Sequence, residues 1–546
     1  MSKVAEDLVR EYENLKGLRG NWETHWEEIA ERILPRQMGF IGQRTDGEKR
    51  TQKIFDSKPQ VALERFASVM DSMLTPRQTH WHGLKTTDER LNDDFEVKQW
   101  FYEVNKTLFS MRYSPKANFA GQNLERWTSM GAFGTGALFI DFEPGVGLRY
   151  RCVNLRDLYL MENHQGIVDT VFRCFSYTAR QAAQKWGENN LPESLKKCLE
   201  NPNKANDKHA FLHVVRPNVS YEPGRMDARG KPWASVYVYV NDKTMMEEGG
   251  YNSFPYSFSR YFTAPDEVYG RSPGMTALAD IKMLNEMAKT DIRAAHKLVD
   301  PPILLHDDGI LGGGAMTVNL KPGGMNVGGV NKDGKALMQP FNSGARLDIN
   351  EAKMEQRRAA IDDAFLVTLF QILVDTPRMT ATEALIRAQE KGMLLTPTMG
   401  RQQSEALGPL IERELDLLAF HRMLPPMPPI LVEAGGEYEI TYDSPMSRMA
   451  RAEELVGVQR SLEILTPFAQ LAGPEIFDVF DTDGLARLTA EVSGVPLPAL
   501  RSPDAVAAIR AQRAQQEQAA MAVQAAQPLA GAVKDVAQAN ALLNQQ

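Results

Sequence analysis

Helical periodicity dominates the beginning of the chain. Apolar residues recur at intervals of three and four over residues 1–34, 58–74 and 96–111, which is the spacing of one face of an amphipathic helix. Pro35 and Pro76 follow the first two segments, and proline ends a helix because it lacks a backbone N–H and clashes with the preceding turn. The pattern therefore predicts three helices, with a polar, glycine-containing loop between the first two.

The pattern changes to short β-prone runs after a fourth helix. Ser114 and Pro115 predict the start of that helix, because serine is a favourable N-cap and proline fits the first turn. Thr178 and Gly187 bracket a short helix further along the chain. Runs rich in β-branched and aromatic residues occur at 137–142, 148–153, 158–161, 167–177, 210–216 and 233–240. Helices followed by a sheet predict an α+β, helix-rich fold.

Two long helices are predicted in the middle of the chain. Ser272 and Pro273 open the first, which extends to about residue 299, and the second covers residues 348–373. The glycine-rich stretch between them carries a turn signal at Lys321–Gly324 and predicts a small β excursion. Two long helices joined in this way cannot bury both of their faces within one chain, so we expect neighbouring subunits to cover them.

The last part of the chain is predicted to be mainly helical. A long helix spans residues 380–423, with breaks expected at Gly392, Pro397 and Gly408–Pro409. A strand at 438–442 follows. The tail is rich in Ala and Gln, a composition that favours helix but offers little apolar area.

Charged residues are unevenly distributed around the first long helix. At about 100° per residue, one side carries a basic stripe, which consists of Lys282, Lys289, Arg293, His296 and Lys297. Glu286 also lies on this side. Apolar residues, including Leu284, Ile292 and Val299, fall on the opposite side and predict a packed face. Three interpretations of the basic stripe stay open: a solvated face with salt bridges, a surface facing a DNA backbone, or a contact with an adjacent identical subunit.

Composition and charge limit the function further. The chain has 546 residues and a net charge of −8, whereas a protein that binds DNA tightly usually carries a basic excess. Any contact with nucleic acid is therefore expected to be weak or transient. The three cysteines, Cys152, Cys174 and Cys198, predict neither disulfides nor a zinc site, because no two have C-x-x-C spacing. The longest apolar run, 364–374, is too short to span a bilayer, and neither a membrane nor a secreted protein is predicted.

Several enzyme-like strings occur, and each lacks a required residue. Gly329–Ala336 resembles a phosphate-binding loop but ends in alanine instead of a hydroxyl residue, so Asp333–Gly334 is better explained as a turn. Asp481–Gly484 resembles part of a calcium loop without its first and last ligands, and predicts a turn or a helix cap. His80 and His82 lack acidic neighbours and are interpreted as structural. We predict no catalytic residue, no metal ligand and no cofactor.

Five segments carry a resemblance to a known family. They are residues 154–160, 166–173, 178–187, 269–285 and 378–383. The first three resemble the wing sheet of the podovirus portal proteins, which are the head-to-tail connectors of short-tailed bacteriophages. The fourth resembles the beginning of their first stem helix, and the fifth resembles the start of the helix after their channel loop. The order of elements matches over about residues 1–500, and the tail departs most from the family.

The resemblance implies a portal fold with wing, stem, clip and crown. The implied regions are the wing at 1–271 and 380–443, the stem helices at 272–300 and 348–374, the clip at 301–347, the channel loop at 375–379, the crown at 444–502, and the tail at 503–546 as a helical barrel or a disordered segment. The channel-loop residues are Asp375, Thr376, Pro377, Arg378 and Met379. The basic stripe becomes a candidate for DNA-channel or inter-subunit contacts.

The resemblance also implies a structural function rather than a catalytic one. Portal proteins form a dodecameric ring at one capsid vertex, and the ring conducts DNA during packaging and ejection and docks the terminase and the tail. The implied partners are copies of the chain itself, double-stranded DNA, the terminase large subunit, the major capsid protein, scaffolding protein, tail adaptor or nozzle proteins, and internal core or ejection proteins. The implied location is the head-tail junction of the virion, after assembly in the host bacterial cytoplasm.

Two alternatives stay open. A metal-dependent nuclease would need clustered acidic residues, and the nearest candidates are Asp307, Asp308, Asp362 and Asp363, which look like helix caps or solvated faces. An internal core or adaptor protein of the virion would join particles without forming rings.

Overall fold

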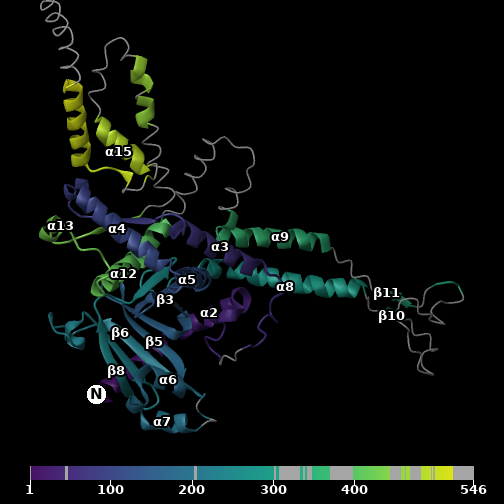
Figure 1. Ribbon diagram of the computed structural model, residues 1–546. Coiled ribbons are helices and arrows are strands. Elements are labelled where there is room, and N and C mark those ends of the chain that lie inside the picture. The colour runs from purple at the N-terminus through teal and green to yellow at the C-terminus, as the bar shows by residue number, and fades with distance from the viewer. Residues whose placement is uncertain are drawn as a thin grey trace, which may run out of the picture. The chain divides into compact units, whose positions relative to one another are not determined.

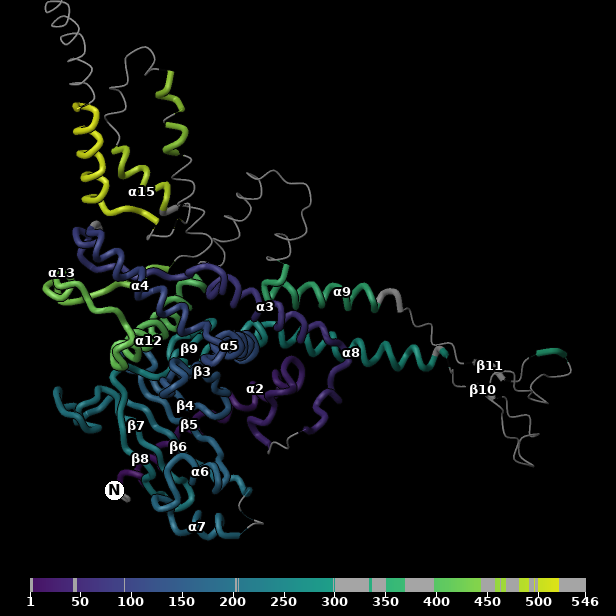
Figure 2. The backbone as a smooth tube through the Cα atoms, in the orientation of Figure 1, coloured from purple at the N-terminus to yellow at the C-terminus, as the bar shows by residue number. Residues whose placement is uncertain are grey.

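The computed structural model describes residues 2–42, 47–201, 204, 206–299, 347–368 and 397–442, together with shorter stretches within 303–340 and 457–519. The chain divides into two units, Met1–Arg77 with Met111–His421 and Gln78–Ser110 with Arg422–Gln546. The first unit combines antiparallel sheets with many helices, and Figures 1 and 2 show the course of the chain. The α+β, helix-rich class predicted from the sequence is confirmed.

The first unit contains most of the regular structure. Its helices include α1 (Ser2–Leu18), α2 (Gly20–Ile33), α3 (Lys58–Leu74), α5 (Phe119–Phe133), α6 (Ala179–Trp186), α7 (Glu193–Glu200), α8 (Pro273–Val299), α9 (Leu347–Ala364) and α12 (Gly408–Phe420). Its strands include β2 (Thr135–Glu143), β3 (Gly147–Val153), β4 (Leu158–Glu162), β5 (Val168–Thr178), β6 (Lys208–Pro217), β7 (Trp233–Tyr239), β8 (Thr244–Tyr251), β9 (Tyr256–Arg260), β10 (Ile303–Leu305) and β11 (Met338–Pro340). Strands β4 to β8 form one sheet in sequence order, β3-β2-β9 form a second, and β10 pairs with β11.

The five-stranded sheet is covered by helices on both faces. Leu8 of α1 packs with Phe172 and Leu212 on one face, and Trp186 of α6 packs on Phe211 on the other. Successive side chains of a strand point to opposite faces, so the neighbours Phe211 and Leu212 serve different cores. Thr178 forms the predicted cap of α6, in which its hydroxyl accepts a hydrogen bond from the backbone N–H of the third helical residue.

The three-stranded sheet begins at a sharp turn after α5. Gly134 ends the helix with φ of +85°, a conformation that favours glycine. A Cβ atom at this position would lie 2.0 Å from the carbonyl oxygen of Gly270, so the two chain segments touch through their backbones. The contact brings the residues before α8 against the end of α5.

A buried ion pair connects α12 with the end of α4 (Phe95–Arg112). Arg112 Nε donates to Glu414 at 3.0 Å, and both side chains are fully buried. The hydroxyl of Tyr150 donates to the same carboxylate at 2.6 Å. Burial alone would lower the pKa of Arg112, but the Glu414 carboxylate outweighs burial and raises it. The guanidinium charge therefore depends on one buried partner.

The predicted start of the fourth helix is wrong. Residues 114–117 form a turn in which Ala117 N donates to Ser114 O at 3.0 Å. Asn118 then adopts a left-handed conformation with φ of +57°, and α5 begins at Phe119. A left-handed residue cannot continue a right-handed helix, so the serine–proline pair belongs to a separate turn. Strands β8 and β9 and helix α7 were not predicted.

The two later helices also differ from the prediction. α9 ends at Ala364, and Leu366 adopts a φ of +59° just beyond it. Residues 367–368 are helical again, and the predicted end at Leu373 lies outside the described residues. The predicted helix at 380–423 is described from residue 397 onward. The break expected at Gly408–Pro409 is instead a π-helical turn at Gln403–Leu407 followed directly by α12. Proline lacks the N–H that would bond the carbonyl four residues earlier, and the helix widens there without ending.

The second unit is smaller. Its elements include β1 (His82–Lys85), α13 (Pro429–Glu433), β12 (Glu439–Tyr442) and α15 (Thr482–Val492), and β1 pairs with β12. Val97, Phe101 and Leu431 form a small core. The ring of His80 stacks on a phenylalanine, and His82 is buried beside Trp81, which confirms the structural interpretation of these histidines. Residues 503–519 are helical, as predicted for the start of the tail.

Candidate functional site on the two-helix arm

Helix α8 begins on a buried cap. Ser272 Oγ accepts a hydrogen bond from Met275 N at 2.9 Å and donates one to Ala132 O, at the end of α5, at 2.8 Å. A Cβ atom on Gly274 would lie 3.1 Å from the same carbonyl oxygen. The predicted serine cap is confirmed. It anchors the first turn of α8 to α5, and this contact sets the direction in which the helix leaves the body of the unit.

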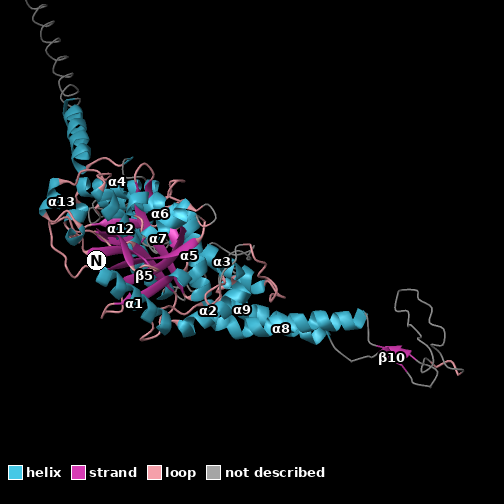
Figure 3. Cartoon of the chain, turned by 90° about the horizontal axis from the view of Figure 1, so that it is seen from below, coloured by secondary structure: helices cyan, strands magenta, loops and turns pink. Residues whose placement is uncertain are grey.

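Helices α8 and α9 lie side by side and project away from the sheets (Figures 1 and 3). We call this pair the two-helix arm. Arg357 donates to Asp280 at 2.8 Å, and Asn350 donates to Asp291 at 3.2 Å, so the helices are antiparallel. Within the described part of α9, the buried residues are Met354 and Ile361, seven positions apart. A seam this narrow buries one side of α9 and leaves the opposite side exposed.

A segment before α3 holds both helices of the arm. Asp56 accepts hydrogen bonds from Arg358 at 2.8 and 3.1 Å, and Lys58 pairs with Asp362 at 2.5 Å. Asn285 of α8 accepts from the backbone N–H of Phe55 at 2.8 Å. We call these contacts the base clamp. The sequence did not predict it, because its partners lie roughly 230 to 300 residues apart and share no spacing signal.

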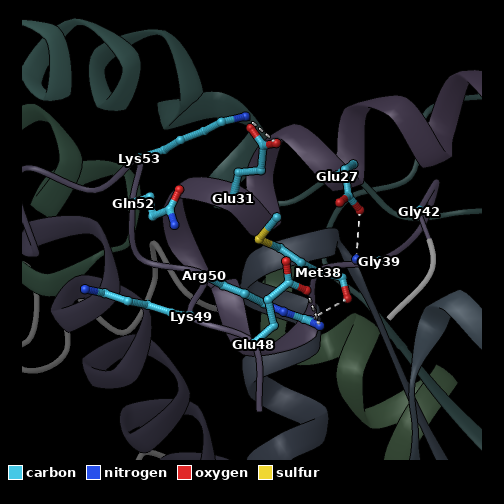
Figure 4. Close-up of a pocket in the computed structure, with 10 residues that line it drawn as sticks. All are labelled: Glu27, Glu31, Met38, Gly39, Gly42, Glu48, Lys49, Arg50, Gln52 and Lys53. Atoms are coloured by element: carbon cyan, nitrogen blue, oxygen red, sulfur yellow. Dashed lines mark hydrogen bonds and ion pairs between the residues drawn. The ribbon is translucent and has the colours of Figure 1, made fainter. Parts of the chain in front are cut away.

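Two cavities lie beside the base clamp. One, of about 240 Å³, lies between α2 and the loop that follows it (Figure 4). In this cavity the Glu27 carboxylate accepts from the backbone N–H groups of Gly39 and Phe40 at 3.0 and 2.7 Å, and Lys53 pairs with Glu31 at 2.7 Å. The other, of about 440 Å³, is lined by Arg32, Gln52, Lys53, Phe55, Lys282, Asn285, Glu286 and Lys289. Charges of both signs are paired at these cavities, which favours structural roles for the residues.

The basic stripe divides into two parts. Near the base clamp, Lys282 pairs with Glu28 of α2 at 2.7 Å, and the hydrogen bond from Lys282 lowers the pKa of Glu28. Lys289 pairs with Glu286 of its own helix at 3.1 Å and lies 5.8 Å from the ring centre of Phe55. These two lysines are therefore engaged within the chain. Toward the end of α8, Arg293, His296 and Lys297 are exposed.

The opposite side of α8 is packed only in part. Leu284 is buried as predicted, but Ile292 and Val299 remain 44% and 88% exposed. The prediction of one continuous packed face is therefore wrong, because α9 and the base clamp cover the first part of α8 and leave these two apolar side chains outside.

Other predicted sites fall partly beyond the described residues. The channel-loop residues Asp375–Met379 and the acidic pair Asp307–Asp308 lie outside them, as does most of the segment at 301–347. Gly334 adopts a φ of +75°, in agreement with the predicted turn. Asp481 Oδ1 accepts from two backbone N–H groups at the start of α15, so the cap predicted in place of a calcium loop is confirmed.

Among the described residues, no group of three or more His, Cys, Asp and Glu side chains could hold a metal ion. No helix in the same part of the chain combines the length and the apolar character that a membrane crossing requires.

A half-covered helical arm on an α+β body defines a subunit with surfaces suited to assembly. The chain belongs to the bacteriophage head to tail connecting protein family, whose family model matches residues 5–500. It is a structural subunit of the head-to-tail connection, the portal class predicted from the sequence.

Two curated relatives are similar over most of their length. One is the portal protein of Salmonella phage epsilon15, which is 29% identical over 517 residues, covering 92% of this chain and 90% of the relative. The other is the probable portal protein of Bordetella phage BPP-1, which is 28% identical over 518 residues with the same coverage. Among solved structures, one chain from the virion of a native gene transfer agent particle is 13% identical to this chain, with a TM-score of 0.33. The alignment covers 84% of this chain and 99% of that chain.

Proposed function

We propose that copies of this chain form a closed, dodecameric ring at one capsid vertex, and that double-stranded DNA passes through the ring during packaging and ejection. The observation that supports this most is the two-helix arm, whose outer sides have no cover within the described residues. Exposed apolar side chains such as Ile292 and Val299 are costly when they stay in water, and an identical neighbour can cover them.

A ring requires one repeated contact between two different surfaces of identical subunits. The ring closes when the rotation from one subunit to the next is a whole fraction of a full turn. The arm offers two different outer sides, one from each helix. In this proposal residues 272–300 and 348–374 are the stem and 301–347 the clip. The wing comprises 1–271 and 380–443, the channel loop 375–379, the crown 444–502 and the tail 503–546.

Passage of DNA fits the charge of the chain. A net charge of −8 disfavours a tight grip, because each phosphate that a protein neutralises adds salt-sensitive affinity. Lys282 and Lys289 are already paired with glutamates, which weakens the basic stripe further. The contact with DNA in this proposal is transient and independent of sequence.

The proposed partners follow from a place at the head-tail junction. They are the terminase large subunit, the major capsid protein, scaffolding protein, tail adaptor or nozzle proteins, and internal core or ejection proteins. The ring assembles in the host bacterial cytoplasm and then becomes part of the virion.

The test is the state of the purified full chain at micromolar concentration, measured by sedimentation velocity and negative-stain microscopy. We expect closed rings with a central opening. A monodisperse monomer that nevertheless joins phage particles would overturn the proposal in favour of an adaptor or core protein. Magnesium-dependent cleavage of duplex DNA, abolished by Asp362→Asn together with Asp363→Asn, would overturn it in favour of a nuclease.

A further inference from the structure

The outer sides of the two-helix arm carry opposite charge. On α8, Arg293, His296 and Lys297 are exposed toward the end of the helix. On α9, the exposed acidic residues within the described part are Glu351, Glu355 and Asp363. Glu355 also pairs with Arg358 of its own helix at 3.1 Å. Exposed charges on one helix are often simply solvated, so the sign of the charge alone does not identify a binding surface. The arrangement of these charges on the arm is more informative.

The two charged sides point away from each other. Asp280 and Asp291 mark the side of α8 that faces α9, through their bonds to Arg357 and Asn350. At about 100° per residue, Arg293 lies roughly 140° to 160° around α8 from these aspartates. Likewise Glu355 and Asp363 lie about 100° and 180° around α9 from Met354, which is buried. The arm is thus basic on one flank and acidic on the other.

Apolar and small side chains lie beside the charged ones. Ile292 and Val299 are exposed on α8, seven residues apart. Ala352 and Ala359 are exposed on α9, again seven residues apart, and lie on the acidic side. A large apolar side chain such as Ile292 fits over a small one such as Ala352, as in the seam of two packed helices with flanking charges. The bond between Asn350 and Asp291 shows that these parts of α8 and α9 lie at a similar level along the arm.

We infer that the basic flank of α8 docks on the acidic flank of α9 of a second, identical copy, with Ile292, at the edge of the basic flank, seated against Ala352. This inference rests on the proposed function, because it names the surfaces that join the ring. A second copy is the occupant that complements both flanks, whereas a DNA backbone complements the basic flank and is repelled by the acidic one. Each copy then offers one flank to each neighbour, which is the contact that a ring repeats.

Two variants of the full chain test the contact, each with reversed charge on one flank. The first is Arg293→Glu with Lys297→Glu, and the second is Glu351→Lys with Glu355→Lys. In either variant every contact joins like charges, so we expect the concentration for half assembly, measured by mass photometry, to rise at least about tenfold. Lys353→Glu is the matched control, because Lys353 is exposed on another side of α9, and its rings should persist.

Mixing gives the decisive result. An equimolar mixture of the two variants restores opposite charges at every contact when the copies alternate, and so does a single chain that carries all four substitutions. We expect rings in both cases. The inference would be overturned if rings persist in each variant alone. It would also be overturned if the mixture and the four-substitution chain stay dissociated although circular dichroism shows that the proteins are folded. Reduced DNA retention with unchanged rings would assign the basic flank to DNA. If the unaltered chain forms no rings, the proposed function fails as well.

Discussion

The buried pair of Arg112 and Glu414 allows a sharp test of how the first unit is held together. Replacing Glu414 by Gln keeps the size of the side chain but removes its charge. The Arg112 side chain is fully buried, and it donates to both carboxylate oxygens at 2.5 to 3.1 Å. After the substitution, an amide N–H₂ group takes the place of one of these oxygens, and the guanidinium charge stays buried without a compensating partner.

The expected cost follows from this burial. Breaking a buried ion pair by removing one partner typically costs about 3–5 kcal/mol, most of it from the charge left behind. Glu414 also accepts from the Tyr150 hydroxyl at 2.6 Å, so we expect Glu414→Gln to lower the free energy of unfolding by at least about 3 kcal/mol. Replacing both partners, as Arg112→Met with Glu414→Leu, removes the stranded charge and should recover more than half of that loss.

Urea unfolding of the full chain, followed by far-ultraviolet circular dichroism under conditions that keep it monomeric, measures both effects. Arg225→Met is the matched control, because Arg225 forms its ion pairs with Glu222 and Asp227 at the surface, and no change in unfolding is expected. A loss below about 1 kcal/mol for Glu414→Gln, or a double variant less stable than the single one, would refute the reasoning.

Two further predictions concern the base of the arm. Gly134→Ala should lower the free energy of unfolding by more than about 2 kcal/mol, because its Cβ atom would lie 2.0 Å from Gly270 O. Gly145→Ala is the control, since Gly145 has a similar φ of +82° but open space around it. Equal losses of stability in thermal unfolding of the two variants would contradict the steric cause. Lys282→Met should remove stability that depends on pH. The pKa of Glu28 is lowered in the folded state, so this contribution is present above the unfolded value of about 4.3 and disappears as the pH falls through the folded value. Melting curves of the two proteins should differ at neutral pH and converge in acid, and a difference that is constant with pH would contradict the pairing.

Features with local signals were predicted well from the sequence. The helix at 58–74 matches α3 at both ends, and Thr178 caps α6, because each depends on residues within one or two turns. The start of α5 was missed because the left-handed conformation of Asn118 has no signature in the apolar pattern.

The candidate site was predicted only in outline. Periodicity alone places a basic stripe on α8, but it cannot show that Lys282 meets Glu28 from a helix about 250 residues earlier in the chain. The base clamp depends on Asp56 and Arg358, which are 302 residues apart. Such contacts form only when the whole unit folds, and they decide which basic residues stay exposed.

The central claim is that copies of the chain cover the two-helix arm of one another around an axis. Cryo-electron microscopy of the assembled full chain tests it most directly, since it shows what lies against α8 and α9. We predict a closed ring in which Arg293 and Ile292 of each copy contact α9 of the next. A chain that stays single, with these residues packed against its own body, would contradict the claim.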